Sequence, residues 1–198
     1  MRRLRRSELP KDTVELARFL IGKILVRDTD EGRTTGHIVE TEAYLVGDAA
    51  AHSFRGLTPR NKSLFLDRGH AYVYFIYGCW FALNVSSENA GTGAGVLLRA
   101  LEPIAGIDIM KRRRGTEKLL DLARGPGRLA TAMAIERSLD GTDLCAAGPL
   151  WLAAGPKSKV TPAIGESVRI GITREVDRLL RFYARGSPFV SGPKRLQG

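Results

Sequence analysis

Cysteine, histidine and long apolar runs are all scarce in this 198-residue chain. Cys79 and Cys145 have no CxxC spacing, which argues against a disulfide scaffold or a zinc ribbon and favours a reducing compartment. The three histidines lack metal-ligand spacing, so we expect no metal and no cofactor. The richest apolar run, 72–85, is interrupted by Gly78 and Asn84 and is too short to span a bilayer, so we expect no membrane partner.

Acidic residues are outnumbered, because 31 Lys and Arg stand against 21 Asp and Glu and give a net charge of +10. Such an excess attracts polyanions, since binding phosphates releases their counterions. Charge alone leaves open a nucleic acid, a membrane surface or no specific partner. The Arg-rich start at 1–6 resembles the beginning of a signal peptide, but Glu8, Pro10, Lys11 and Asp12 stand where an apolar segment belongs. We therefore expect a cytoplasmic protein.

Length and an apolar content of 43% predict a single domain over residues 1–198. Successive strands favour a meander over a βαβ alternation, which predicts an α+β fold with a curved antiparallel sheet flanked by helices. Strands are expected at 24–26, 37–44, 71–77, 81–86, 95–101, 150–153, 168–172 and 181–184. Helices are expected from Asp12 or Thr13 to Gly22, from Thr58 to Phe65, from Ile104 to Gly115, and after Gly127.

The strand at 37–44 carries two carboxylates and an aromatic ring in an otherwise basic protein. Alternation along a strand puts Glu40, Glu42 and Tyr44 on one side. Beside apolar and aromatic neighbours, Glu42 could have a raised pKa and act as a general base toward water. The alternative is a surface salt bridge, and these residues alone favour it, because most strand glutamates are solvated or paired.

One cation, Arg99, lies within the apolar strand at 95–101. A cation in that position needs an acidic partner or an anionic ligand. A structural ion pair with Glu102 or Glu40 is the alternative to a ligand site. These residues alone do not separate the two interpretations.

Aromatic residues crowd the hairpin at 71–86, where Tyr72 and Tyr74 should face one way and Tyr77 the other. Exposed rings can stack on bases, each worth roughly 1–3 kcal/mol, although aromatic strands are more often plain core. His52 and Asn84 could read the edge of a base or satisfy nearby backbone groups.

Short blocks in order along nearly the whole chain carry a family resemblance. They are 40–44 (ETEAY), 51–53 (AHS), 58–61 (TPRN), 72–74 (YVY), 76–78 (IYG), 84–86 (NVS), 97–103 (LLRALEP), 125–126 (GP) with Leu129, 181–183 (RFY) and 185–188 (RGSP). Together they closely resemble the alkyladenine (3-methyladenine) DNA glycosylase family. The resemblance implies a monofunctional enzyme of base excision repair. Such an enzyme flips an alkylated or deaminated purine out of duplex DNA, hydrolyses its N-glycosidic bond and leaves an abasic site.

The resemblance also implies roles for single residues. Glu42 matches the base that activates water, and Arg99 with the backbone carbonyl of Ile170 matches the groups that hold this water. Tyr44 and His52 match one wall of the base pocket, and Tyr74 matches the opposite wall.

Further matches concern selectivity and DNA. Asn84 matches the side chain that crowds the 2-amino group of guanine, and Tyr77 matches the residue that wedges into the duplex. Cys79 and Trp80 follow the wedge where the vertebrate-type pattern has Met and Tyr, so the range of accepted lesions is open. Cys79, Trp80, Arg60 and Arg128 are also expected to contact DNA.

We expect a monomeric, nucleoid-associated bacterial enzyme that acts on double-stranded DNA containing a damaged purine. A non-catalytic nucleic-acid-binding domain on the same fold is the main alternative, and a nucleoside hydrolase for small molecules is another. The net charge and Tyr77 argue against the nucleoside hydrolase. No lysine lies among the matched pocket positions, which argues against a Schiff-base lyase.

Overall fold

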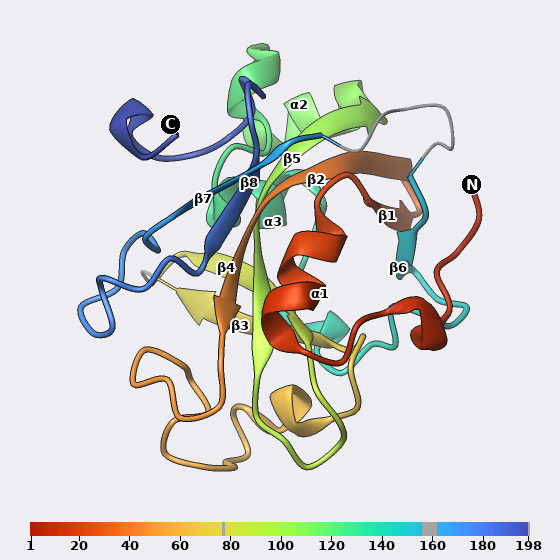
Figure 1. The fold of residues 1–198 in the computed structure, drawn as a ribbon. Coiled ribbons are helices and arrows are strands. Elements are labelled where there is room, and N and C mark those ends of the chain that lie inside the picture. Colours follow the sequence, from red (N-terminus) through yellow and green to blue (C-terminus); the bar gives the residue numbers. More distant parts are fainter. Residues whose placement is uncertain (77, 156–161, 198) are drawn as a thin grey trace.

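The computed structural model describes residues 1–76, 78–155 and 162–197 and has an α+β fold (Figure 1). An antiparallel sheet curls into a half barrel, in the order β3-β4-β5-β2-β1-β6, while β8 pairs with β2 and β7 with β8. The expected class, a curved antiparallel sheet flanked by helices, is confirmed. The strands are β1 (Ile24–Thr29), β2 (Gly32–Tyr44), β3 (Ala71–Ile76), β4 (Trp80–Ser86), β5 (Gly95–Ala105), β6 (Leu150–Ala153), β7 (Ile164–Ser167) and β8 (Arg181–Ala184).

Three α-helices and five short 3-10 helices are described alongside the sheet. The α-helices are α1 (Thr13–Leu20), α2 (Ile107–Arg114) and α3 (Pro126–Ala132). The 3-10 helices are η1 (Arg6–Glu8), η2 (Lys62–Phe65), η3 (Leu119–Asp121), η4 (Arg137–Leu139) and η5 (Lys194–Leu196). None of the helices in these ranges has the length and apolar content needed to cross a bilayer.

The curl of the sheet is centred on β2. The first half of β2 pairs with β1, and the second half pairs with β8 at Glu40, Thr41 and Glu42, while β5 follows β2 along its other edge. The pairing with β5 is irregular on both sides of Glu40. Such irregularities bend a strand and increase its twist. Both faces of β2 are covered at this point, so Glu40 and Glu42 have no exposed surface.

Helix α1 packs against β2 and β5, with Leu16 and Leu20 fully buried. Asp12 caps the helix by accepting a hydrogen bond from the Glu15 amide (2.9 Å). After Leu20 the chain turns at Gly22, whose φ of +80° suits a residue without a side chain. The expected start and stop of this helix are confirmed.

Some predicted boundaries are wrong. Strand β5 continues to Ala105, so α2 begins at Ile107 and not at Ile104. Gly106 separates the two elements with a φ of +72°, and a Cβ there would lie 2.4 Å from the Arg33 carbonyl oxygen. Backbone pairing with β2 therefore overrides the helical pattern.

The strand expected at 168–172 lies instead at Ile164–Ser167, and 168–172 is irregular chain bordering the cavity described below. The helix expected from Thr58 is confined to η2, because the Asn61 side chain accepts the Thr58 amide (2.7 Å) and holds the preceding residues in a turn. Strand β3 ends at Ile76, and Tyr77 lies outside the described residues.

Candidate active site

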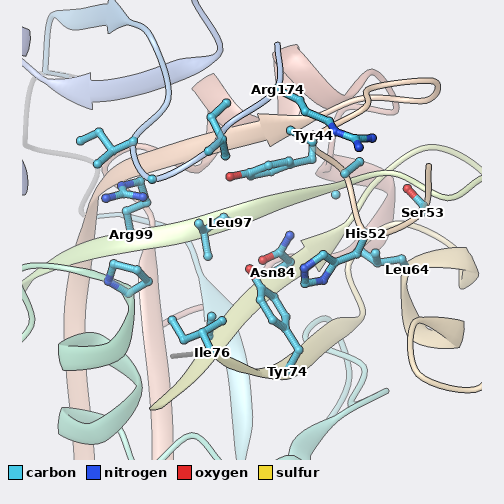
Figure 2. Close-up of a pocket in the computed structure, with 18 of the residues that line it drawn as sticks. Tyr44, His52, Ser53, Leu64, Tyr74, Ile76, Asn84, Leu97, Arg99 and Arg174 are labelled. Carbon is cyan, nitrogen blue, oxygen red and sulfur yellow. The ribbon is translucent and has the colours of Figure 1, made fainter. Parts of the chain in front are cut away.

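A cavity of about 360 Å³ opens over β3, β4 and β5 beside the end of β2 (Figure 2). The end of β2 supplies Tyr44, the interiors of β3, β4 and β5 supply Tyr74, Asn84 and Arg99, and the loop after β2 supplies His52. The cavity is also lined by Ala49, Ala50, Ala51, Ser53, Leu64, Ile76, Ala82, Gly95, Leu97, Pro126, Ile170, Gly171, Ile172, Thr173 and Arg174. Residues expected to form a base pocket therefore meet in one cavity.

Aromatic rings face each other across this cavity. Tyr44 lies on one side, and Tyr74 with His52 lies on the other (Figure 2). The rings of His52 and Tyr74 meet edge-on with centroids 4.5 Å apart, and Tyr72 stacks on Tyr74 at 4.8 Å. Tyr72 and Tyr74 thus share a face, as predicted from alternation. The predicted grouping of His52 with Tyr44 is wrong, because the loop after β2 crosses over to the side of β3.

The orientation of His52 is set by Tyr72, whose hydroxyl lies 2.9 Å from the His52 Nδ1. Partial burial lowers the pKa of His52, and the positive charge of Arg60 lowers it further. The ring is therefore neutral at neutral pH, when it can stack on a base without adding charge.

The Glu42 carboxylate is fully buried just behind the cavity wall. Its Oε1 accepts the Ile170 amide (2.7 Å) and lies 3.2 Å from Arg99 Nη1, while its Oε2 accepts the Tyr44 hydroxyl (3.0 Å). The surface salt bridge that the residues alone favoured is wrong. Burial raises the pKa of Glu42, opposed by the charge of Arg99 and the hydrogen bonds from Ile170 and Tyr44. Such a group can accept a proton.

Arg99 joins Glu42 to the second acid of the strand. Its Nε donates to Glu40 Oε1 (3.0 Å), so one guanidinium contacts both carboxylates. Of Glu102 and Glu40, the two acids proposed as partners in a structural ion pair, Glu40 is the one that Arg99 contacts. Arg99 also lines the cavity. Arg99 therefore forms a structural ion pair and also lines the candidate site, so the two interpretations do not exclude each other.

Sequence reasoning missed the rest of this buried charge cluster. Arg181 has no exposed surface, and its Nε donates to Glu40 Oε1 (2.7 Å), while the Ser191 amide donates to Glu40 Oε2 (2.7 Å). An arginine flanked by Leu180 and Phe182 in a short apolar strand is the only local signal. Its partner lies 141 residues away along the chain, which local patterns do not show.

A second buried ion pair was also missed. Asp48, in the loop after β2, binds Arg169, and both side chains are fully buried. The Arg169 guanidinium carbon lies 4.7 Å from the centroid of the Tyr44 ring. This pair holds the loop and the irregular segment beside Ile170 against the tyrosine.

Asn84 projects toward the cavity from β4 (Figure 2). It is buried, and its Oδ1 has no hydrogen-bond partner within the described residues. A buried polar atom of this kind is satisfied by a ligand or by water. In the same ranges no three His, Cys, Asp or Glu side chains gather as a metal site.

The residues expected to touch DNA lie apart from the cavity walls. Cys79 and Trp80 are exposed at the β3–β4 turn, and Trp80 packs near Gly127 at the start of α3. Arg60 is exposed, and the exposed Arg128 pairs with Asp121 (2.8 Å). Tyr77 itself is outside the described residues, so its expected wedge role stays a prediction.

Comparison with known proteins places the chain among hydrolases that cleave N-glycosyl bonds in DNA. A family model described as "Methylpurine-DNA glycosylase (MPG)" matches residues 7–188. The chain belongs to the methylpurine-DNA glycosylase family, and its role is the repair of alkylated purines. The family expected from the sequence blocks is confirmed.

Individual relatives are similar in sequence to this chain over most of their length. A protein of Mesorhizobium japonicum named "Putative 3-methyladenine DNA glycosylase" is 67% identical over 193 residues, which cover 97% of this chain and 91% of the relative. A protein with the same name from Paraburkholderia phytofirmans is 51% identical, over 98% of this chain and 90% of the relative. Another with that name, from Methanoculleus marisnigri, is 49% identical, over 91% of this chain and 94% of the relative.

Proposed function

We propose that this chain is a monofunctional glycosylase of the 3-methyladenine class that flips a damaged purine into the cavity and hydrolyses its N-glycosidic bond. The observation that carries the proposal is the buried Glu42 carboxylate, held by two hydrogen bonds and an ion pair with Arg99 beside an aromatic-walled cavity. The names of the relatives support the lesion class.

Stacking provides the binding step. Flipping a base costs a few kcal/mol and less for a weakly paired lesion. A ring held between Tyr44 on one side and Tyr74 with His52 on the other recovers roughly 1–3 kcal/mol per stacking contact. Purines alkylated at N3 or N7 carry a positive charge and gain further cation-π attraction. The pocket thus selects electron-poor bases.

Hydrolysis then proceeds from the buried acid. Glu42 accepts a proton from a water molecule, the water oxygen bonds to C1′, and the C1′–N9 bond breaks with its electrons leaving on the purine. Arg99 keeps Glu42 ionised, and the Ile170 carbonyl is proposed to help hold the water. General-base catalysis contributes about 10²- to 10⁴-fold. The lability of a charged purine must supply the rest of the rate.

Selectivity and DNA contacts complete the proposal. Asn84, which lines the cavity, is proposed to crowd the 2-amino group of guanine. Tyr77 is proposed to fill the space that the base leaves, with Cys79 and Trp80 beside it and Arg60 and Arg128 on phosphates. The enzyme is proposed to act as a monomer on duplex DNA, without a cofactor.

The test is Glu42→Gln, measured as free base released in a single turnover from a duplex with one 3-methyladenine, corrected for spontaneous release. We expect release to fall at least about 100-fold, while affinity for the lesion duplex stays within a few-fold. Glu166→Gln on β7 makes the same chemical change at an exposed glutamate and should leave release unchanged. Undiminished release in Glu42→Gln would refute the assignment. Lesion binding without release in the native protein would favour a non-catalytic binding domain.

A further inference from the structure

The buried pair of Asp48 and Arg169 has no task in the hydrolysis outlined above. Arg169 Nη1 binds Asp48 Oδ2 and donates to the Ala43 carbonyl (3.0 Å), and Nη2 donates to Asp48 Oδ1 (3.1 Å). The Ala50 amide also donates to Asp48 Oδ1 (2.9 Å). Neither side chain has exposed surface. The desolvation of two buried charges can cost more than their attraction returns, so stability alone does not account for the pair.

The position of Arg169 relative to Tyr44 suggests that purpose. The guanidinium lies over the Tyr44 ring, at 4.7 Å from its centroid. Tyr44 lines the cavity, whereas Arg169 is buried and does not line it. The guanidinium therefore covers the ring face turned away from the cavity. A base stacked on the opposite face would lie within about 9 Å of the Arg169 charge, given a contact distance of about 3.5–4 Å.

An uncompensated cation at that distance would disfavour a positively charged base on the other side of the ring. With an effective dielectric constant of about 20, two unit charges so placed repel strongly enough to change affinity on the order of tenfold. The hydrogen bonds and charge of Arg169, with the Ala50 amide, outweigh burial and hold the pKa of Asp48 below its usual value. Asp48 is thus ionised at neutral pH.

We propose that Asp48 is a specificity-determining residue, because its carboxylate neutralises Arg169 behind Tyr44 and lets that wall hold a cationic purine. This inference rests on the proposed function and extends it to the charge of the lesion. Arg169 supports the ring, and Asp48 sets the net charge behind it. Substrates of one shape should therefore be distinguished by charge when Asp48 is changed.

Two duplexes that differ only in lesion charge test the proposal. One carries 3-methyladenine, which is cationic as a nucleoside, and the other its neutral carbon isostere 3-deaza-3-methyladenine. Dissociation constants are measured in the Glu42→Gln background, in which enzymatic release is slow, and are corrected for spontaneous base loss. Adding Asp48→Asn is expected to weaken binding of the cationic lesion on the order of tenfold more than binding of the isostere. Equal weakening of both would overturn the proposal, because a purely structural role does not depend on lesion charge.

Arg169→Gln removes the positive charge behind Tyr44 instead of the negative one, and it tests the proposal if Asp48→Asn does not fold. At pH 8 the Asp48 carboxylate, still held by the Ala50 amide, becomes the uncompensated charge. The affinity for the cationic lesion should then rise several-fold relative to that for the isostere. An unchanged ratio of the two dissociation constants would overturn the proposal. If the Glu42→Gln protein prefers neither lesion duplex to undamaged DNA, the proposed function itself fails. If both lesion duplexes are preferred to undamaged DNA but the ratio of their dissociation constants is the same in all variants, only the role of Asp48 is rejected.

Discussion

Replacing Glu40 with Gln is expected to destabilise the protein strongly, although Glu40 has no proposed part in the chemistry. Its carboxylate is fully buried and accepts from Arg99 (3.0 Å), Arg181 (2.7 Å) and the Ser191 amide (2.7 Å). In Glu40→Gln, one amide oxygen can still accept from the two arginines. The amide nitrogen then faces the Ser191 N–H, so that two donors meet. The charge of one buried guanidinium also loses its counter-ion.

The size of the effect follows from these contacts. Removing one partner of a buried ion pair costs about 3–5 kcal/mol. For a domain of this length, 1 kcal/mol lowers Tm by about 2–4 °C, so a decrease of about 6–20 °C is expected. An exposed pair is worth about 0–1 kcal/mol. Glu175→Gln, which removes the charge from such a pair with Arg178 (3.7 Å), is the matched control and should shift Tm by less than about 4 °C.

Thermal unfolding followed by circular dichroism, with urea unfolding as a second measure, distinguishes the two variants. If Glu40→Gln and Glu175→Gln lower Tm by the same small amount, the buried cluster does not stabilise the fold as argued. A destabilised but folded Glu40→Gln protein should also release base more slowly, because Arg99 loses one of its two carboxylate partners.

Two further predictions concern the site and the sheet. Because burial raises the pKa of Glu42, base release should fall with decreasing pH through a value above the ordinary 4.5, and single-turnover rates across pH that fall only below 4.5 would contradict this. In Gly165→Ala, the new Cβ would lie 2.3 Å from the buried Tyr183 ring, and the crowding should cost about 1–3 kcal/mol, seen as a lower Tm. Gly148→Ala, with no atom within 4 Å of its Cβ, is the control, and equal Tm values for both would refute the steric argument.

Much of the fold is predictable because its signals are local. The cap at Asp12, the apolar spacing of α1 and the turn at Gly22 act within a few residues of one another, and all are confirmed. The start of α2 was misplaced because pairing between β5 and β2 extends the strand beyond its apolar part. The strand predicted at 168–172 was misplaced because its apolar residues pack beside the cavity without entering the sheet.

The family, the α+β class and the candidate residues Glu42, Arg99 and Tyr44 follow from the amino-acid sequence alone, because short blocks keep their order along the chain. Which charges are buried together depends on the three-dimensional fold. The partner of Arg181 lies 141 residues away and that of Arg169 lies 121 residues away. Such pairs form because β2 changes its pairing partner from β1 to β8 along its length, and no local sequence pattern encodes that change. The same topology buries Glu42, which the residues without the family resemblance favoured as a surface acid.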